Sequence, residues 1–152
     1  MRGAWRQIWF RYPGRKLALA EARVEQVKTK KDGSRAKKDS IFYKCESCLR
    51  LAKGALSKPH KAAKTAWTKA KGKAFKAGDP LPARPEDLPL LAVVDHKEAL
   101  VPVDGRELSW DEYLNRLFCI PEDLQVLCDE CHSAKSKEEN SERRQNKTKR
   151  VV

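Results

Sequence analysis

The chain has 152 residues, and its 33 Lys and Arg outnumber its 21 Asp and Glu, which gives a net charge of +12 at pH 7. Charged residues make up 36% of the chain, and no apolar run approaches the roughly 20 residues that a membrane-spanning helix needs. The first twelve residues mix Trp with Arg and lack the apolar centre of a signal peptide. We therefore expect a cytoplasmic protein with no membrane partner, and a chain this basic most often binds an anionic polymer such as nucleic acid.

The charge is distributed unevenly along the chain. Residues 1–44 carry 13 basic and 4 acidic residues, and residues 49–78 carry 9 basic and no acidic residues. Residues 79–132 reverse the sign, with 4 basic and 13 acidic residues. This asymmetry indicates that the segments have different functions: the basic segments contact phosphates, and the acidic segment binds a different ligand.

Two helical patterns, a loop and a strand are predicted in the amino-terminal third. Apolar residues at spacings of three and four predict a helix over residues 17–28, and the same spacing runs from Trp5 to Tyr12. Residues 30–40 are rich in Lys and contain Asp-Gly-Ser, which indicates a turn or flexible loop. Residues 41–43, Ile-Phe-Tyr, predict a short strand.

The middle of the chain predicts a helix, a connector and a strand. Residues 60–76 are mostly Ala and Lys, which are good helix formers, and they form one weak apolar stripe around Trp67. Four prolines in residues 77–89 predict an extended connector. Residues 90–94, Leu-Leu-Ala-Val-Val, predict the most convincing strand of the chain.

The last third predicts two helices. Ser109 followed by Glu112 forms a capping-box pattern that opens a helix through Cys119. We expect the buried face of this helix to consist of Trp110, Tyr113, Leu114 and Leu117. Residues 130–144 predict a second helix that frays into a basic tail.

Four of the five cysteines form two pairs, each with two intervening residues: Cys45 with Cys48, and Cys128 with Cys131. Each pair can form a knuckle that directs both thiolates to one tetrahedral zinc ion, so the two pairs complete a closed structural site. A disulfide framework is the alternative, but nothing marks the chain as secreted and one cysteine would be left over. That cysteine, Cys119, lies in an amphipathic pattern and is expected to pack as an apolar residue.

Catalysis would need side chains other than the cysteines, because four thiolates leave a zinc ion with no open position. His132 directly follows Cys131, so the knuckle would fix its backbone. Asp95 and His96 follow the predicted strand over residues 90–94, and strand ends often present side chains to a site. The third histidine, His60, is expected to be solvated within the Lys-rich segment.

A family resemblance follows from these residues. Residues 94–97 read VDHK, and residues 123–135 read DLQVLCDECHSAK. Together with residues 41–48, they resemble the HNH endonuclease family, and are most similar to small bacteriophage-type members whose ββα-metal motif is braced by a four-cysteine zinc site. The resemblance implies an α+β fold with such a zinc-braced ββα-metal (His-Me finger) core.

The resemblance also implies a domain organisation. A helical basic arm would cover residues 1–40, and a nuclease domain would cover residues 41–140. Within that domain lie a basic insertion over residues 49–78 and a Pro-rich connector over residues 79–89, where the family normally has a short hairpin. Residues 141–152 would form a flexible basic tail.

The resemblance further assigns roles to matching residues. His96 matches the general base that activates water, and Asp95 and His132 match the ligands of a second divalent ion, such as Mg²⁺ or Mn²⁺, which grips the scissile phosphate. Asp123 stands where the family usually has an Asn that helps to hold the loop carrying the base. An Asp accepts the same hydrogen bonds but cannot donate one through an amide, so its role is open.

Several basic residues are candidates for contact with the phosphate backbone. Lys135 lies three residues beyond His132 on the same helical face, and it either reaches a phosphate or stays solvated. Trp67 and Phe75 could stack on bases, although the position of Trp67 in the Ala stripe favours an anchoring role. The insertion is assigned to backbone contact, which predicts a steep fall of affinity with salt. Its candidate contacts are Lys61, Lys64, Lys69 and Lys73.

These features lead to one preferred hypothesis and two alternatives. The preferred hypothesis is a phage-encoded, metal-dependent HNH-type DNA endonuclease or nickase that acts in the host cytoplasm and leaves 5′-phosphate and 3′-hydroxyl ends. A non-catalytic zinc-ribbon protein that binds nucleic acid is the first alternative, and the Asp at position 123 favours it. The second is a zinc-stapled adaptor for a phage or host protein, which the acidic segment and the Trp-rich arm favour.

Overall fold

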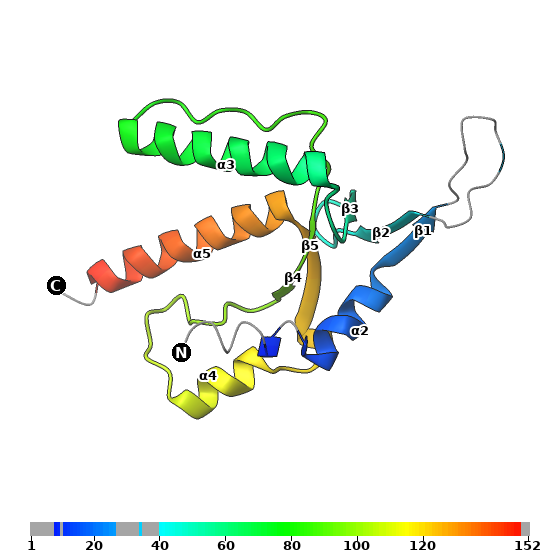
Figure 1. Cartoon of the computed structure of the whole chain (residues 1–152). Coiled ribbons are helices and arrows are strands. Elements are labelled where there is room, and N and C mark those ends of the chain that lie inside the picture. The colour runs from blue at the N-terminus through cyan, green and yellow to red at the C-terminus, as the bar shows by residue number, and fades with distance from the viewer. Residues whose placement is uncertain (1–7, 10, 27–33, 35–39, 150–152) are drawn as a thin grey trace.

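The computed structural model in Figure 1 describes residues 8–9, 11–26, 34 and 40–149, and within them the chain has the predicted α+β fold. Two small antiparallel sheets are joined to helices that project from them (Figure 1). The elements in chain order are α2 (Pro13–Glu21), β1 (Arg23–Gln26), β2 (Ser40–Lys44), β3 (Leu51–Lys53), α3 (Lys58–Ala77), β4 (Ala92–His96), α4 (Trp110–Leu117), the short 3₁₀ helix η1 (Pro121–Asp123), β5 (Leu124–Cys128) and α5 (Asp129–Lys149). No helix in these ranges is long and apolar enough to cross a membrane.

The amino-terminal helix is shorter than predicted. It begins at Pro13, whose fixed φ suits the first helical position, and ends at Glu21. The prediction of a helix over residues 17–28 was therefore wrong for residues 23–26, which form β1, while residues 27 and 28 lie outside the described residues. Pairing with β2 explains the change, because Val24 lies opposite Phe42. The hydrogen bonds and side-chain contacts between the two strands stabilise these residues more than the helix that their apolar spacing predicts. Trp5 and most of the predicted loop over residues 30–40 also lie outside the described residues.

The predicted strand over residues 41–43 is confirmed as part of β2, which lies between β1 and β3. The second sheet consists of β4 and β5, with Ala92 opposite Cys128 and His96 opposite Leu124. The strand predicted over residues 90–94 is shifted by two residues, so Asp95 and His96 are its last two residues and do not follow it. The shift arises because β5 offers partners as far as Leu124, while Leu91 makes only a single bridge to β3.

The core surrounds β5, four of whose five residues are buried. One cluster joins Ala18 of α2 to Val94, Leu124 and Val126, with Cys119 packed against it as expected of an apolar cysteine. A second cluster contains Leu127, Cys128, Ala52 and Cys45. The two clusters together hold α2, both sheets and the cysteines in one unit.

The predicted helix over residues 60–76 is confirmed as α3, which ends at Gly78 in the left-handed conformation. None of its 20 residues is buried. The connector over residues 79–89 has no regular secondary structure, as predicted, and the Trp67 indole donates a hydrogen bond to the Pro82 carbonyl over 3.1 Å. Trp67 therefore anchors the connector to the helix, whereas the Phe75 side chain is 78% exposed.

The capping box of Ser109 and Glu112 is confirmed at the start of α4. Of the predicted buried face of this helix, Leu117 is buried, whereas Trp110 is 71% exposed. The prediction for Trp110 was wrong because it occupies the first turn, whereas the helix meets the core at its last turn.

The carboxy-terminal helix α5 continues to Lys149, through residues predicted to form a flexible tail. Tertiary contacts explain its length. Arg143 donates to the Val101 carbonyl over 3.1 Å, and Asn146 donates to the Val103 carbonyl over 2.8 Å. These bonds tie the end of α5 to the loop between β4 and α4.

Candidate functional site

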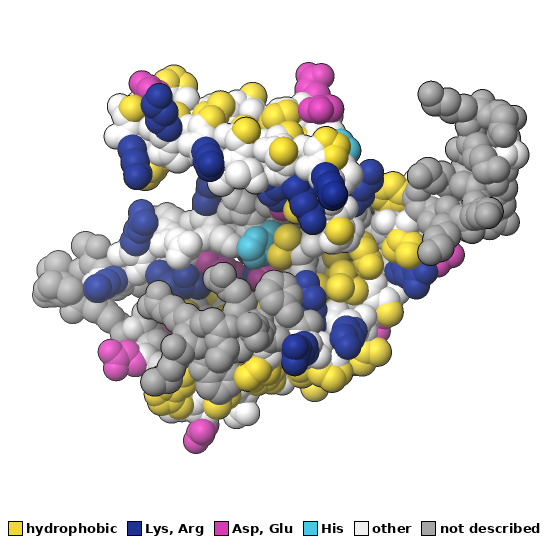
Figure 2. All heavy atoms as spheres, viewed as in Figure 1, with side chains coloured by type: hydrophobic (Ala, Val, Ile, Leu, Met, Phe, Trp, Pro, Cys, Tyr) yellow, Lys and Arg dark blue, Asp and Glu magenta, His cyan; other side chains and the backbone are white. Residues whose placement is uncertain are grey.

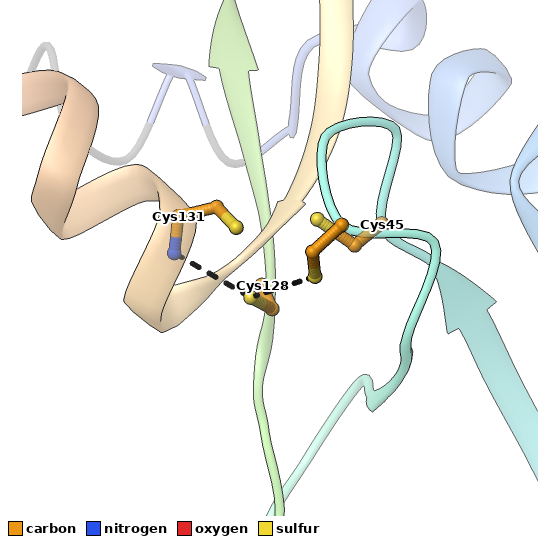
Figure 3. Close-up of side chains that lie close together, drawn as sticks. Cys45, Cys128 and Cys131 are labelled. Carbon is orange, nitrogen blue, oxygen red and sulfur yellow. Dashed lines mark hydrogen bonds between the residues drawn. The ribbon is translucent and has the colours of Figure 1, made fainter.

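The four paired cysteines converge on one point, as Figure 3 shows for Cys45, Cys128 and Cys131. Their sulfur atoms all lie within 4.8 Å of one another, and those of Cys48 and Cys128 are 3.8 Å apart. Four thiolates at about 2.3 Å from one zinc ion would lie about 3.8 Å from one another. The predicted cluster is thus confirmed, and its donors and spacing fit one tetrahedral metal ion such as zinc.

Local backbone geometry explains how the two knuckles form. In the first, Cys45 N–H donates to the Arg50 carbonyl and Leu49 N–H donates to the Cys45 carbonyl, with Leu49 at a φ of 59°. The second knuckle spans the end of β5 and the first turn of α5, where unpaired N–H groups favour thiolates. Cys131 N–H donates to Cys128 Sγ there, over 3.4 Å.

Glu46 ties the first knuckle to β5. Its N–H donates to the Val126 carbonyl, and its carboxylate accepts from the Val126 N–H, both over 2.9 Å. This pair of bonds joins the first knuckle to the strand that ends at Cys128.

The thiols of the cluster differ in how readily they lose their protons. Arg50 Nε donates to Cys48 Sγ over 3.3 Å and lowers the pKa of that thiol to about 6. Burial raises the pKa of the Cys128 thiol to about 12. Such a buried thiol keeps its proton at neutral pH unless a metal ion replaces it, so this site would bind metal with release of protons.

A second group of polar side chains lies where the end of β4 faces the first turns of α5. The predicted metal ligands Asp95 and His132 lie side by side, with 3.8 Å between Asp95 Oδ1 and His132 Nε2. Lys135 Nζ is 2.9 Å from Asp95 Oδ2 and 2.7 Å from Glu139 Oε1. Burial would lower the pKa of Lys135, but the hydrogen bonds and charges of Glu139 and Asp95 outweigh it and raise that pKa.

His96 is held by the end of α4 and by the amino-terminal arm. Its Nε2 lies 3.2 Å from the Leu117 carbonyl, and its ring stacks on Trp9 with the ring centres 4.8 Å apart. Since a carbonyl oxygen only accepts, Nε2 carries the proton and Nδ1 of the neutral ring keeps a lone pair. The His96 carbonyl accepts from Gln125 and from Lys135, which fixes the backbone below the ring.

Asp123 holds the neighbouring loop through its backbone. Its carbonyl accepts from the N–H of Lys97, the residue after His96, over 2.8 Å. The pKa of the Cys119 thiol is raised mainly by burial. The negative charge of the Asp123 carboxylate raises it further.

The candidate phosphate-binding lysines of α3 fall into two groups. Lys61, Lys69 and Lys73 are exposed. Lys64 is instead paired with Asp129, with 2.7 Å between Nζ and Oδ2, and only 28% of its side chain is exposed. This pairing weakens the case for Lys64 as a phosphate contact.

Sequence reasoning missed the structural roles of Asp129, Gln125 and Trp9. Asp129 is an acidic residue in the first turn of a helix, which is a recognisable signal, but its partners lie 65 and 45 residues away. Gln125 lies in an apolar strand, and Trp9 lies in the aromatic amino-terminal arm. No sequence pattern near either residue predicts its contact with His96.

Comparisons with known proteins add no family assignment. No family model matches the chain, and searches of curated proteins and of solved structures find no significant match.

Proposed function

We propose that the protein is a metal-dependent endonuclease of the HNH type that hydrolyses phosphodiester bonds in DNA. The observation that carries this proposal is the contact of Asp95 on β4 with His132 on α5, with His96 next to Asp95 at the end of the same strand. This order of two strands and a helix agrees with the ββα arrangement that the sequence resemblance implies. The cysteine cluster lies at the junction of the second strand and the helix, where it would brace that arrangement.

The geometry suits the roles that the resemblance implies. Neighbouring ligands at about 2.1 Å from one octahedral Mg²⁺ ion are about 3.0 Å apart, so Asp95 Oδ1 and His132 Nε2, which are 3.8 Å apart, would share an ion after moving about 0.8 Å closer. A divalent ion held by these two residues would act as a Lewis acid on the scissile phosphate. His96 Nδ1 keeps a lone pair because Nε2 faces the Leu117 carbonyl, so it can take a proton from water. In-line attack by that water on phosphorus would break the P–O3′ bond, so that O3′ leaves with a proton from solvent as the 3′-hydroxyl and the phosphate stays on the 5′ end.

Asp123, which stands where the family usually has an Asn, is compatible with this chemistry. The bond from the Lys97 N–H to the Asp123 carbonyl holds the segment after the base through the main chain. A main-chain carbonyl is present with either Asp or Asn, so this part of the role does not depend on a side-chain amide.

The exposed side of α3 provides a surface for the DNA backbone. At 100° per residue, Lys58, Lys61, Lys69, Lys73 and Lys76 fall within an arc of about 120°, opposite Trp67. All five are exposed, and α3 contains no acidic residue. We call these five residues the lysine stripe. Figure 2 shows Lys and Arg side chains along the edge of α3 that faces α5.

Two lysines of α5 lie near the side of that helix that contacts α3. Lys137 and Lys147 lie within about 80° of Asp129 around the helix axis, and Asp129 is the residue of α5 that contacts Lys64 of α3. Both lysines are exposed. The stripe and these lysines together favour a polyanion as the partner of this side of the molecule.

The test is the conversion of supercoiled plasmid to nicked or linear DNA with added Mg²⁺ or Mn²⁺. We expect His96→Ala to lower the rate by at least about 100-fold, as loss of a general base does. His60→Ala is the matched control, since His60 lies in the first turn of α3 and bonds to Ser57. Equal cleavage by the wild type and His96→Ala would contradict the proposal.

The ion pair of Lys135 with Asp95 favours a second candidate, a non-catalytic zinc-ribbon protein that binds nucleic acid, because the ammonium occupies the carboxylate that would hold the ion. Tight DNA binding without cleavage in any divalent ion would support this candidate. Lys135→Met should then leave binding nearly unchanged.

DNA contact by the lysine stripe is tested through the salt dependence of binding. Lys69→Gln with Lys73→Gln should reduce the slope of log affinity against log salt by about two, since each phosphate contact contributes about 0.9. Lys16→Gln with Lys44→Gln removes the same charge from exposed positions on α2 and β2 and serves as the control. Equal slopes for the two double variants would show that the lysine stripe does not contact DNA.

A further inference from the structure

The amino-terminal arm reaches the candidate base through Trp9. The indole ring of Trp9 lies on the imidazole of His96, with ring centres 4.8 Å apart and an angle of 24° between the planes. Trp9 also packs against the core cluster that contains Val94 and Leu124. The stack therefore lies at the edge of the core, beside the last residue of β4.

Trp9 is itself held in place by Tyr12. The N–H of Tyr12 donates to the Trp9 carbonyl over 3.1 Å, and the two rings stack with centres 5.8 Å apart. The Tyr12 ring meets Phe118 edge-on at 5.4 Å, and its hydroxyl donates to the Cys119 carbonyl. The arm is thus fastened to the short segment that follows α4.

The last residue of α4, directly before that segment, supplies the other contact of the imidazole. Leu117, whose carbonyl faces His96 Nε2 at 3.2 Å, directly precedes Phe118 and Cys119. The indole restrains the ring from one face, and the carbonyl restrains it at one nitrogen. An imidazole has two side-chain torsions, and a face contact combined with an edge contact restricts both.

We propose that Trp9 is a positioning residue for the reaction: it holds the His96 imidazole so that Nδ1 stays directed at the attacking water. The proposal rests on the proposed function, because it needs His96 to be the base. Trp9 acts through His96 and has no contact with substrate in this role. Small displacements of a catalytic group reduce rates by one to two orders of magnitude, so loss of the stack should lower kcat and leave KM nearly unchanged.

The experiment compares three variants in steady-state cleavage of a short DNA duplex with added Mg²⁺. Trp9→Ala should lower kcat by at least tenfold with KM within twofold of the wild type, and Trp9→Phe, which keeps an aromatic face, should retain at least one third of kcat. Trp110→Ala is the matched control, because that side chain is 71% exposed on α4. Wild-type kcat in Trp9→Ala would overturn the proposal, as would equal losses in Trp9→Ala and Trp9→Phe.

A spectroscopic readout separates positioning from loss of folding. In the wild type, the indole should shift the ring-proton resonances of His96 upfield, with His96→Ala identifying the signals among three histidines. Trp9→Ala should remove this shift while zinc content stays the same, and an unchanged shift would overturn the proposal.

If His96→Ala cleaves like the wild type, the proposed function fails and this inference fails with it. If His96→Ala is inactive and Trp9→Ala is fully active, only the inference fails.

Discussion

Asp129 shows how one residue within a metal knuckle can organise its surroundings. Its carboxylate accepts from Lys64 over 2.7 Å, from Arg84 over 3.3 Å and from the Leu91 N–H over 3.2 Å. Burial alone would raise the pKa of this carboxyl, but these hydrogen bonds and the two positive charges outweigh it and lower the pKa below its ordinary value. Asp129 therefore joins α3, the connector and the residue before β4 to the cysteine cluster.

We expect Asp129→Asn to destabilise the protein at pH 7 by about 2 kcal/mol, because hydrogen bonds to a charged group are lost or weakened. A carboxyl with a lowered pKa in the folded state stabilises above its unfolded pKa of about 3.9, and this stabilisation is lost as pH falls through the folded pKa. The difference in unfolding free energy between variant and wild type, measured with urea, should therefore be constant from pH 7 to 5 and shrink below about pH 4.

Asp79→Asn is the control for this measurement, since Asp79 lies exposed in the connector. It should change stability by less than about 0.5 kcal/mol at every pH. A pH-independent difference for Asp129→Asn would show that its charge is not the source of the stabilisation.

At the scale of elements, α3 is a long helix without a buried residue. Its Ala and Lys content favours a helix, but most of the stability of a helix in a protein comes from tertiary packing, and Gly72 weakens α3 further. The contacts that support it include the Lys64–Asp129 pair and the contact of the Trp67 ring with Arg84 of the connector. The orientation of the lysine stripe depends on these contacts.

Trp67→Ala should loosen α3 from the connector, because it removes both the aromatic ring and the hydrogen bond to the Pro82 carbonyl. We expect backbone amides of residues 68–77 to exchange with deuterium at least tenfold faster, while the amides of β5 keep their protection. Phe75→Ala, at a side chain that is 78% exposed on the same helix, should leave exchange unchanged. Equal exchange rates in the two variants would show that Trp67 does not anchor the helix.

At the scale of the whole molecule, the core is small for the length of the chain. Within the described residues, 11 apolar residues are buried, and two of them are the cluster cysteines Cys45 and Cys128. The cluster joins the turn between β2 and β3 to the junction of β5 and α5, which are 80 residues apart at Cys48 and Cys128. Domains with small cores commonly depend on such a cross-link, and metal binding then contributes directly to folding free energy.

Metal analysis of purified protein should find about one zinc ion per chain. Cys48→Ser should lose most of this zinc and unfold at a markedly lower temperature, because one of the four ligands is gone. Cys119→Ser is the matched control, since Cys119 packs against the core and lies outside the cluster. Full zinc content in Cys48→Ser, or zinc loss in Cys119→Ser, would contradict the assignment of the four ligands.

Local sequence patterns predicted several features well. The Ala and Lys composition predicted α3, and Ser109 with Glu112 predicted the start of α4, because helix propensity and capping act within a few residues. Long-range partners decided the features that were wrong. Residues 23–26 became a strand because β2 lies beside them, and Trp110 is exposed because only the last turn of α4 meets the core.

For the candidate site, and for the lysines that contribute to the net charge of +12, local patterns again predicted some features and long-range contacts decided the others. The spacing of the cysteines predicted each of the two knuckles, because two residues between cysteines direct both sulfur atoms to one side of a turn, and chain folding brought the two knuckles together. The nuclease function and its catalytic ion stay predictions. Only the tertiary structure decided which lysines are exposed on α3, that Asp129 neutralises one of them, and that Trp9 lies on His96. Each of these contacts joins residues more than 60 positions apart, and chain folding, not local spacing, brings such residues together.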